Sequence, residues 1–422
     1  MKGRKTRKLL SLLLTAALAV MMMTSVVCAA TPNYTAVTGT NTTFDKYLVM
    51  PNDADVPNVT FAYSIAAGAA QPGSATELAV YAGNDPDRVV GAPAIAENQA
   101  VFTPNDSTTA GADGDGIANS ANYKYATKNV IVNFSNVTYS EPGVYRYVIT
   151  EAANTSAGIT MDPEAKRTLD VNVVDDGGSL VISSYVMYYG ELTSAQDKST
   201  VKSDTDLKNA AATGISEGDK CNNYVNTYDT KNIYIGKDIS GNQASKDKYF
   251  KFTVTLAGAG NAAKIQAAGN FTTTALTSDV NGATVIDETS YTNPAVVNTA
   301  ADGSVTVVYY LQGGQYVELK GIPKTATYEV TEADYSADGY VTEDAVTKNF
   351  TITDGSNTIT FDDATSGTIN ADDIQTGFTN TKDGTIPTGV ILSVAGLLIV
   401  GIIAVIGFVF FGIRSKRRYD ED

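Results

Sequence analysis

Residues 220–237 read Lys-Cys-Asn-Asn-Tyr-Val-Asn-Thr-Tyr-Asp-Thr-Lys-Asn-Ile-Tyr-Ile-Gly-Lys. The spacing of the tyrosines and isoleucines predicts two successive strands, in which alternate side chains share a face. Asn226 then shares an apolar face with tyrosines, and Lys237 shares one with isoleucines. Each strand therefore carries one polar residue on its apolar side, and the stretch ends one half of the chain and opens the next.

The sequence on either side of this stretch is an internal repeat. Short runs rich in Thr, Val, Tyr and Ile are separated by turn residues, and helical periodicity is scarce. The same landmarks follow in the same order in both halves: a strand with a lysine, an aromatic strand, a strand ending in Thr-Glu, an Asp/Gly hairpin and a strand with Asn-Thr. We predict an all-β protein with two tandem β-sandwich domains, residues 31–229 and 230–384.

Three polar residues in each half fall on apolar strand faces. They are Lys46, Glu151 and Asn226 in the first half and Lys237, Glu332 and Asn380 in the second. Burial lowers the pKa of a lysine and raises that of a glutamate, so an enclosed pair can exist as neutral amine and neutral acid. The amine is then a nucleophile, and the acid can polarise the asparagine carbonyl and carry the proton as ammonia leaves. This hypothesis gives a Lys–Asn isopeptide bond in each domain. A half-buried Lys–Glu salt bridge is the alternative.

The two ends of the chain carry export and anchoring signals. Residues 1–30 combine a basic start, an apolar run and small residues for cleavage, which is typical of a secretory signal peptide. Residues 390–413 are uncharged and, as a helix, long enough to span a bilayer. Basic residues follow at once, so the positive-inside rule puts the C-terminus in the cytoplasm and residues 31–389 outside.

The composition argues against several functional classes. The chain has no histidine, which excludes histidine-based triads and the commonest metal ligand. The 46 Asp and Glu against 30 Lys and Arg argue against nucleic acid as a partner. Cys221 is the only cysteine beyond the signal peptide, so no intramolecular disulfide can form. With no cofactor loop or metal-ligand cluster in the sequence, we expect no cofactor, no metal and no enzyme activity beyond a reaction of the chain with itself.

The order Lys…Tyr-x-Val-Thr-Glu…Phe-x-Asn-Thr, present at Lys237, Glu332 and Asn380, resembles the sortase-assembled major pilins of Gram-positive bacteria. The likeness is to shaft pilins of the streptococcal type, with tandem immunoglobulin-like (CnaB-type) isopeptide-linkage domains. It implies that the lysine and asparagine of each domain join covalently and that the glutamate promotes the closure. The first half departs from the pattern at Ile149 and Tyr224, and both residues keep an apolar strand.

A pentapeptide, Thr-Ile-Pro-Thr-Gly, stands at residues 385–389 before the hydrophobic run and the basic tail. Residues 385–422 thus resemble a cell-wall sorting signal. The resemblance implies that sortase cuts between Thr388 and Gly389 and transfers Thr388 to a lysine of the next subunit. Lys220 is the nearest match to that lysine, and Lys208 and Lys202 are alternatives.

The resemblance as a whole implies a structural subunit of a covalent pilus shaft, exported, briefly held by the membrane segment and anchored to the cell wall. The expected partners are further copies of the chain, sortase, ancillary pilins, cell-wall peptidoglycan and a host-surface ligand. A monomeric wall-anchored adhesin, or a tip or base pilin that binds a host ligand, is the alternative function.

Overall fold

The computed structural model describes most residues between 34 and 384. Its described ranges are 34–74, 78–113, 117–118, 120–193, 217–258, 263–277, 279–280, 283–284, 286, 289–384 and 405–406. The predicted signal peptide, the predicted cleavage site at Thr388 and Gly389 and nearly all of the predicted membrane segment lie outside these ranges. Within them, no helix is both long and apolar enough to cross a bilayer.

The regular secondary structure of residues 34–384, where described, is β-strand apart from two one-turn 3-10 helices at Ala96–Asn98 (η1) and Ser336–Asp338 (η2). Strand β17 (Phe250–Ala257) shows the cause: every second residue is buried and those between are half-buried. A strand with one face on a core requires this period of two. The prediction of an all-β fold of packed sheets is confirmed.

The sheets of residues 34–228 form what we call the N-terminal sandwich. One large sheet has the strand order β14-β13-β11-β3-β7, with β4 beside β11; the other has the order β12-β15-β2-β9-β6, with β8 beside β9. The strands of the first sheet are β3 (Val59–Ala67), β4 (Val80–Ala82), β7 (Gln99–Phe102), β11 (Gly143–Glu151), β13 (Lys166–Asp176) and β14 (Ser179–Tyr189). Those of the second are β2 (Asn41–Pro51), β6 (Ala94–Ile95), β8 (Thr108–Ala110), β9 (Tyr123–Asn133), β12 (Ile159–Thr160) and β15 (Asn223–Tyr228). A small third sheet joins β1 (Val37–Thr38), β10 (Thr138–Tyr139) and β5 (Val89–Val90).

The sheets of residues 230–381 form the C-terminal sandwich. Its larger sheet has the order β23-β18-β25-β16-β31-β27 and its smaller one β24-β17-β26-β30. The strands of the larger sheet are β16 (Thr230–Ser240), β18 (Lys264–Gly269), β23 (Val296–Asn298), β25 (Tyr316–Pro323), β27 (Val341–Asp344) and β31 (Ile374–Thr381). Those of the smaller are β17, β24 (Val305–Leu311), β26 (Thr327–Glu332) and β30 (Ser366–Thr368). Three two-stranded pairs complete it: β19 (Leu276–Thr277) with β22 (Ser290–Tyr291), β20 (Asp279–Val280) with β21 (Ala283–Thr284), and β28 (Phe350–Asp354) with β29 (Asn357–Phe361).

Each sandwich places an early long strand beside its last strand, and in parallel. In the first, β2 pairs with β15 so that Lys46 lies opposite Tyr224. In the second, β16 pairs with β31 so that Lys237 lies opposite Phe378. Asn226 and Asn380 follow two residues after those partners. Because strand side chains alternate, each asparagine shares a face with the lysine of the neighbouring strand.

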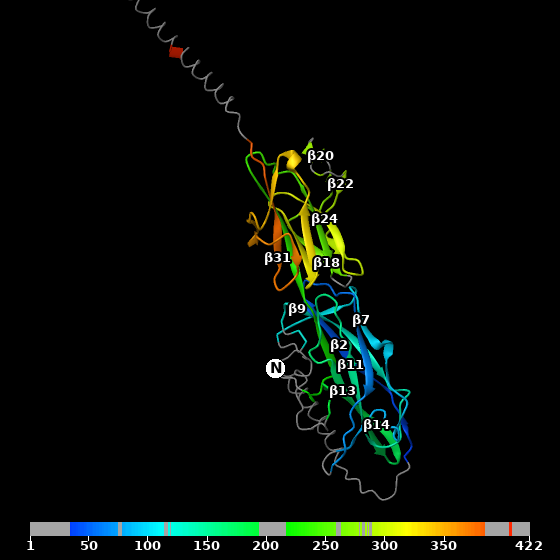
Figure 1. The fold of residues 1–422 in the computed structure, drawn as a ribbon. Helices are drawn as coiled ribbons and strands as arrows, with labels where there is room; N and C mark the ends of the chain where they lie inside the picture. Colours follow the sequence, from blue (N-terminus) through cyan, green and yellow to red (C-terminus); the bar gives the residue numbers. More distant parts are fainter. Residues whose placement is uncertain are drawn as a thin grey trace, which may run out of the picture.

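The two sandwiches lie end to end, joined through a single residue between β15 and β16 (Figure 1). That residue, Asp229, donates its N–H to the Gly158 carbonyl at 2.7 Å and accepts the Lys324 N–H at 3.0 Å, so it is hydrogen-bonded to both sandwiches. Asn232 Nδ2 also donates to Asp53 Oδ2 at 2.9 Å across the junction. The domain limits 31–229 and 230–384 stay a prediction, with which this pairing agrees.

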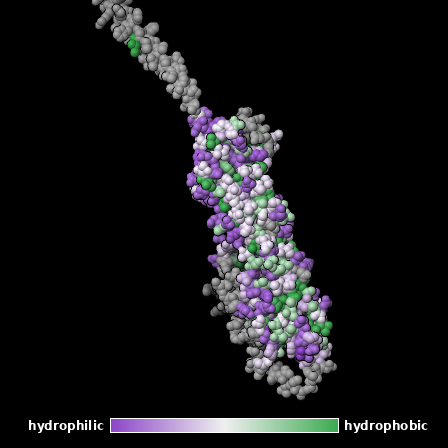
Figure 2. Space-filling view, viewed as in Figure 1, coloured by the Kyte–Doolittle hydropathy of each residue, from purple (hydrophilic) through white to green (hydrophobic). Residues whose placement is uncertain are grey.

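The visible surface of both sandwiches mixes hydrophilic and hydrophobic residues (Figure 2). The six polar residues predicted on apolar faces are not part of that surface. Lys46, Asn226, Lys237 and Asn380 are 0 % exposed and Glu151 is 2 % exposed. The side chain of Glu332 is 1 % exposed.

Candidate functional site

The N-terminal sandwich brings Lys46, Glu151 and Asn226 together in its core. Lys46 and Asn226 come from the adjacent strands β2 and β15, and Glu151 ends β11 in the facing sheet. Lys46 Nζ lies 2.7 Å from Glu151 Oε1. Asn226 Nδ2 donates to the same oxygen at 3.3 Å. One carboxylate oxygen therefore stands between the amine and the amide nitrogen.

Aromatic rings enclose this cluster. Lys46 Nζ lies 4.6 Å from the centroid of the Phe61 ring and 5.9 Å from that of Tyr224. Burial lowers the pKa of Lys46 to about 8, against the opposing attraction of Glu151. In the described part Lys46 Nζ has no well-aligned hydrogen-bond acceptor, although Glu151 is close, so the contact is an ion pair of poor hydrogen-bond geometry. The amine is thus less strongly held in its charged form than an ordinary salt-bridged lysine.

The C-terminal sandwich repeats the arrangement with Lys237, Glu332 and Asn380. Asn380 Nδ2 donates to Glu332 Oε1 at 3.0 Å, and Lys237 Nζ lies 3.7 Å from that oxygen. Lys237 Nζ also donates to the carbonyl oxygens of Asp238 at 2.7 Å and Phe378 at 3.1 Å. The ring of Phe250 covers the amine with its centroid 4.5 Å away.

Burial brings the pKa values of the two ionisable groups of the second site closer together. It lowers the pKa of Lys237 to about 8 and raises the pKa of Glu332 to about 7, and in both cases the partner's charge opposes the change. The neutral pair, amine and carboxylic acid, therefore lies close in free energy to the ion pair. A nucleophilic amine is accessible near neutral pH.

The carboxyl groups face the amide nitrogens and not the amide oxygens. The sequence hypothesis has the acid polarising the asparagine carbonyl, whereas both glutamates contact Nδ2. In the first site the Asn226 Oδ1 atom instead accepts the backbone N–H of Asp162 at 2.7 Å. These contacts differ from the sequence hypothesis and place one glutamate oxygen between the lysine and asparagine nitrogens.

Two residues at the first site were missed by sequence reasoning. Tyr63 donates its hydroxyl to Glu151 Oε1 at 2.8 Å, and burial raises the pKa of Tyr63 well above its usual value, so the hydroxyl keeps its proton. Asp162 is the second. The repeat could have indicated Tyr63, because it pairs with Glu151 as Phe252 pairs with Glu332. No sequence signal indicates Asp162, since its contact comes from the backbone.

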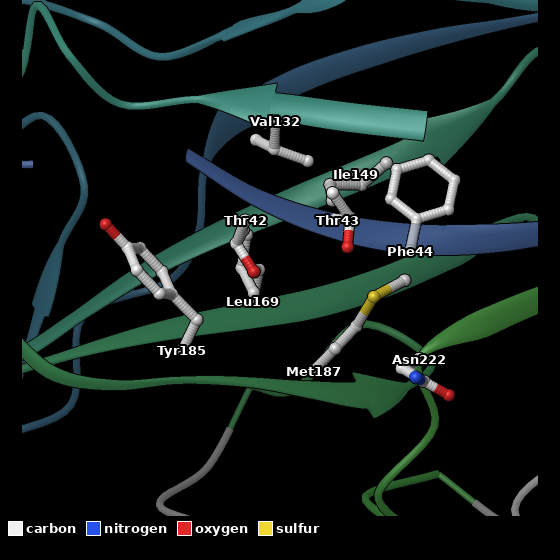
Figure 3. A pocket seen from close by; sticks show the side chains of 9 residues that line it. All are labelled: Thr42, Thr43, Phe44, Val132, Ile149, Leu169, Tyr185, Met187 and Asn222. Carbon is white, nitrogen blue, oxygen red and sulfur yellow. The ribbon is translucent and has the colours of Figure 1, made fainter. Parts of the chain in front are cut away.

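A pocket opens into the N-terminal sandwich between β2 and the strands β11, β13 and β14 (Figure 3). Its lining consists of Thr42, Thr43, Phe44, Val132, Ile149, Leu169, Tyr185, Met187 and Asn222. The lining does not include Lys46, Glu151 or Asn226. Phe44 packs edge-on against both Tyr63 and Tyr224, whose rings adjoin the site. Phe44 therefore belongs both to the pocket lining and to the aromatic cluster around Lys46, Glu151 and Asn226.

Lys220, the predicted acceptor, lies just before β15 and forms an isolated bridge with Tyr188 at the end of β14. It is half-buried. Lys202 and Lys208 lie outside the described residues.

Comparison with known proteins agrees with this picture. Residues 92–229 match the model of a Spy0128-like isopeptide containing domain, and residues 231–382 match a domain of unknown function (DUF7601). A curated pilin of Streptococcus pyogenes serotype M1 is 26 % identical over 289 residues, which cover 68 % of this chain and 71 % of that protein. These matches make the chain similar to Gram-positive pilins. The predicted resemblance is confirmed.

Solved structures of streptococcal pilins also align with this chain. The major pilin from Streptococcus pyogenes does so at 20 % identity and a TM-score of 0.45, over 82 % of this chain and 100 % of that one. The major pilin protein (T3.2) of the same species aligns at 18 % identity and a TM-score of 0.46, over 83 % and 99 %. The curated relative is a pilin, and the similarity to it covers 68 % of this chain.

Proposed function

We propose that this chain is an exported pilin, the shaft subunit of a covalent pilus, and that each of its sandwiches closes an isopeptide bond by itself. The bonds join Lys46 to Asn226 and Lys237 to Asn380. The observation that carries the proposal is the recurrence, in two different sandwiches, of a buried lysine and asparagine on neighbouring parallel strands with one glutamate oxygen between their nitrogens.

The same atoms suggest the course of the reaction. The neutral amine attacks Cγ of the asparagine, and the protonated glutamate delivers its proton to Nδ2. The carboxylate then takes a proton from Nζ, the Cγ–Nδ2 bond breaks, and ammonia leaves as the new amide remains. Glutamate ends the reaction in the state in which it began, so no co-reactant is needed.

We further propose that sortase joins Thr388 to Lys220 of the next subunit. The support is the sorting signal at residues 385–422 and the place of Lys220, six residues before Asn226 and at the edge of the sandwich. Ancillary pilins, peptidoglycan and a host-surface ligand remain the expected further partners.

The internal bonds are tested by the intact mass of residues 31–384, which include all the described strands. The expected mass is two ammonia molecules below the calculated one, and Glu151→Ala or Glu332→Ala each restores one. Glu343→Ala is the matched control, because Glu343 also follows Val-Thr but is 36 % exposed beside Lys348. Full calculated mass for the unaltered chain would refute both bonds.

Shaft assembly is tested in cells that carry the sortase. A ladder of multiples that survives boiling in detergent is expected, and Lys220→Arg should abolish it while Lys202→Arg and Lys208→Arg should not. A single band from the unaltered chain would instead support a monomeric adhesin.

A further inference from the structure

The two candidate sites differ on the oxygen side of their asparagines. In the N-terminal sandwich, Asn226 Oδ1 accepts the Asp162 N–H at 2.7 Å. In the C-terminal sandwich, Asn380 Oδ1 is buried and no described residue donates a hydrogen bond to it. The nitrogen sides are alike, since each Nδ2 donates to its glutamate. The first site therefore has a donor that the second lacks.

The donor is fixed in position by contacts of its own side chain. Asp162 lies between β12 and β13, and its Oδ2 atom accepts the backbone N–H of Val225 at 2.9 Å. The same Oδ2 atom accepts from Arg167 Nη2 at 2.7 Å. Its Oδ1 atom accepts the Glu164 N–H at 3.0 Å. Because Val225 immediately precedes Asn226, the carboxylate ties the donor to the strand that carries the reacting amide.

Arg167 completes this support. It is 0 % exposed, its Nε donates to the Asn223 carbonyl at 3.0 Å, and its guanidinium lies 4.3 Å from the centroid of the Tyr224 ring. A fully buried ion pair is costly to desolvate and contributes little net stability, so its presence beside the amide is not explained by folding stability alone. The Arg167–Asp162 ion pair fixes the direction of the Asp162 backbone N–H.

We propose that the Asp162 N–H is the oxyanion donor for closure of the Lys46–Asn226 bond, with Arg167 as a positioning residue; this inference rests on the proposed function. When Nζ bonds to Cγ, the C=O electron pair moves onto Oδ1, and a donor already 2.7 Å away stabilises that charge without rearranging. Glu151 is then free to move the proton from Nζ to Nδ2. When the Cγ–Nδ2 bond breaks, the carbonyl re-forms and ammonia departs.

The test replaces the amide at residue 162 by an ester, through translation with the α-hydroxy analogue of aspartate in residues 31–384. This change removes the N–H and keeps the side chain. Closure is followed by pulse translation, denaturing quench and mass spectrometry of the two crosslinked peptides. The Lys46–Asn226 bond should close about 100- to 1,000-fold more slowly, the usual effect of losing one oxyanion donor. The Lys237–Asn380 bond in the same molecules should close at its unaltered rate, which controls for synthesis and quenching.

If Asp162 only supports the fold, the rate of closure of the Lys46–Asn226 bond should respond differently. If the ester variant resists protease like the unaltered chain and the first bond closes at the unaltered rate, the donor assignment is wrong. Should the ester leave the first sandwich protease-sensitive, Asp162→Asn and Asp162→Ala decide the matter. Asparagine keeps an oxygen for the Val225 N–H and should retain most of the rate, whereas alanine should slow closure at least about tenfold. Equal rates for the two variants would overturn the inference. Absence of ammonia loss from the unaltered chain would instead refute the proposed function itself.

Discussion

Removal of the Asn226 side chain tests the stabilising effect of the first proposed isopeptide bond. Asn226→Ala prevents closure but leaves the Lys46–Glu151 ion pair, 2.7 Å apart, in place. The bond would close a loop of about 180 residues, from Lys46 to Asn226. By the chain-entropy relation used for disulfides, a crosslink over such a loop stabilises the folded state by roughly 5 kcal/mol. For domains of this size that corresponds to a fall in Tm of roughly 10–20 °C.

The Asn226 side chain also makes hydrogen bonds of its own, and a double-mutant cycle separates the two effects. In a Glu151→Ala background no bond forms, so adding Asn226→Ala removes only the side-chain contacts. Differential scanning calorimetry of the four chains, with the bond content of each checked by mass, gives the coupling free energy. The expected coupling is about 5 kcal/mol. A coupling below about 1 kcal/mol, with the bond present in the unaltered chain, would refute the entropic account of its stabilising effect.

Three further outcomes are expected. Lys46→Arg should restore one ammonia to the intact mass, because a guanidinium keeps its proton at any physiological pH and is no nucleophile. Closure at the second site should have a bell-shaped pH profile in pulse translation, since the amine of Lys237 must lose a proton (pKa about 8) and the acid of Glu332 must hold one (pKa about 7). In an unbonded Asn380→Ala chain, thermal unfolding should show a stability minimum near pH 7–8. The raised pKa of Glu332 gives stability that is lost as pH rises from about 4.5 to 7, and the lowered pKa of Lys237 gives stability that is lost as pH falls from about 10.5 to 8.

Strand alternation explains why six site residues could be predicted from the sequence. The side-chain period of two is a local property, so a lysine between isoleucines or an asparagine between tyrosines is visible without knowing the strand order. The internal repeat then matched each lysine to a glutamate and an asparagine. These six residues meet in space as two clusters, and the all-β fold follows from the same alternation.

The oxygen side of the first site could not be predicted in this way. Asp162 lies 64 residues before Asn226 in a connection between strands, and its contact to Oδ1 comes from a backbone N–H that every residue but proline possesses. Its position depends on Val225 and Arg167, hence on sheet register and on a buried ion pair. The direction of the amide was missed for the same reason, because alternation gives the face of a side chain and not the rotation of its last bond.

Residues 220–237, which join the two sandwiches, determine which parts of the chain would bear tension in a shaft. If Thr388 of one subunit is joined to Lys220 of the next, force enters at Lys220 and leaves at the subunit's own Thr388. It then runs through β15, Asp229 and β16 to Lys237 and across the second bond to Asn380. The loop of about 140 residues between Lys237 and Asn380 is bypassed. The Lys46–Asn226 bond lies beside this path and keeps β15 from being pulled out of its sheet.

Single-molecule pulling between position 220 and the C-terminal end of residues 31–384 tests this path. The unaltered chain should show no long extension, because both ends of the bypassed loop are covalently joined. Glu332→Ala should release about 140 residues, or roughly 500 Å at the 3.3–3.6 Å that an extended residue spans. Glu151→Ala should release no comparable length from position 220, yet from position 34 it should add roughly 600 Å, the contour of about 180 residues. A long extension of the unaltered chain when pulled from position 220 would mean that the load does not cross a Lys237–Asn380 bond, and the proposed force path would fail.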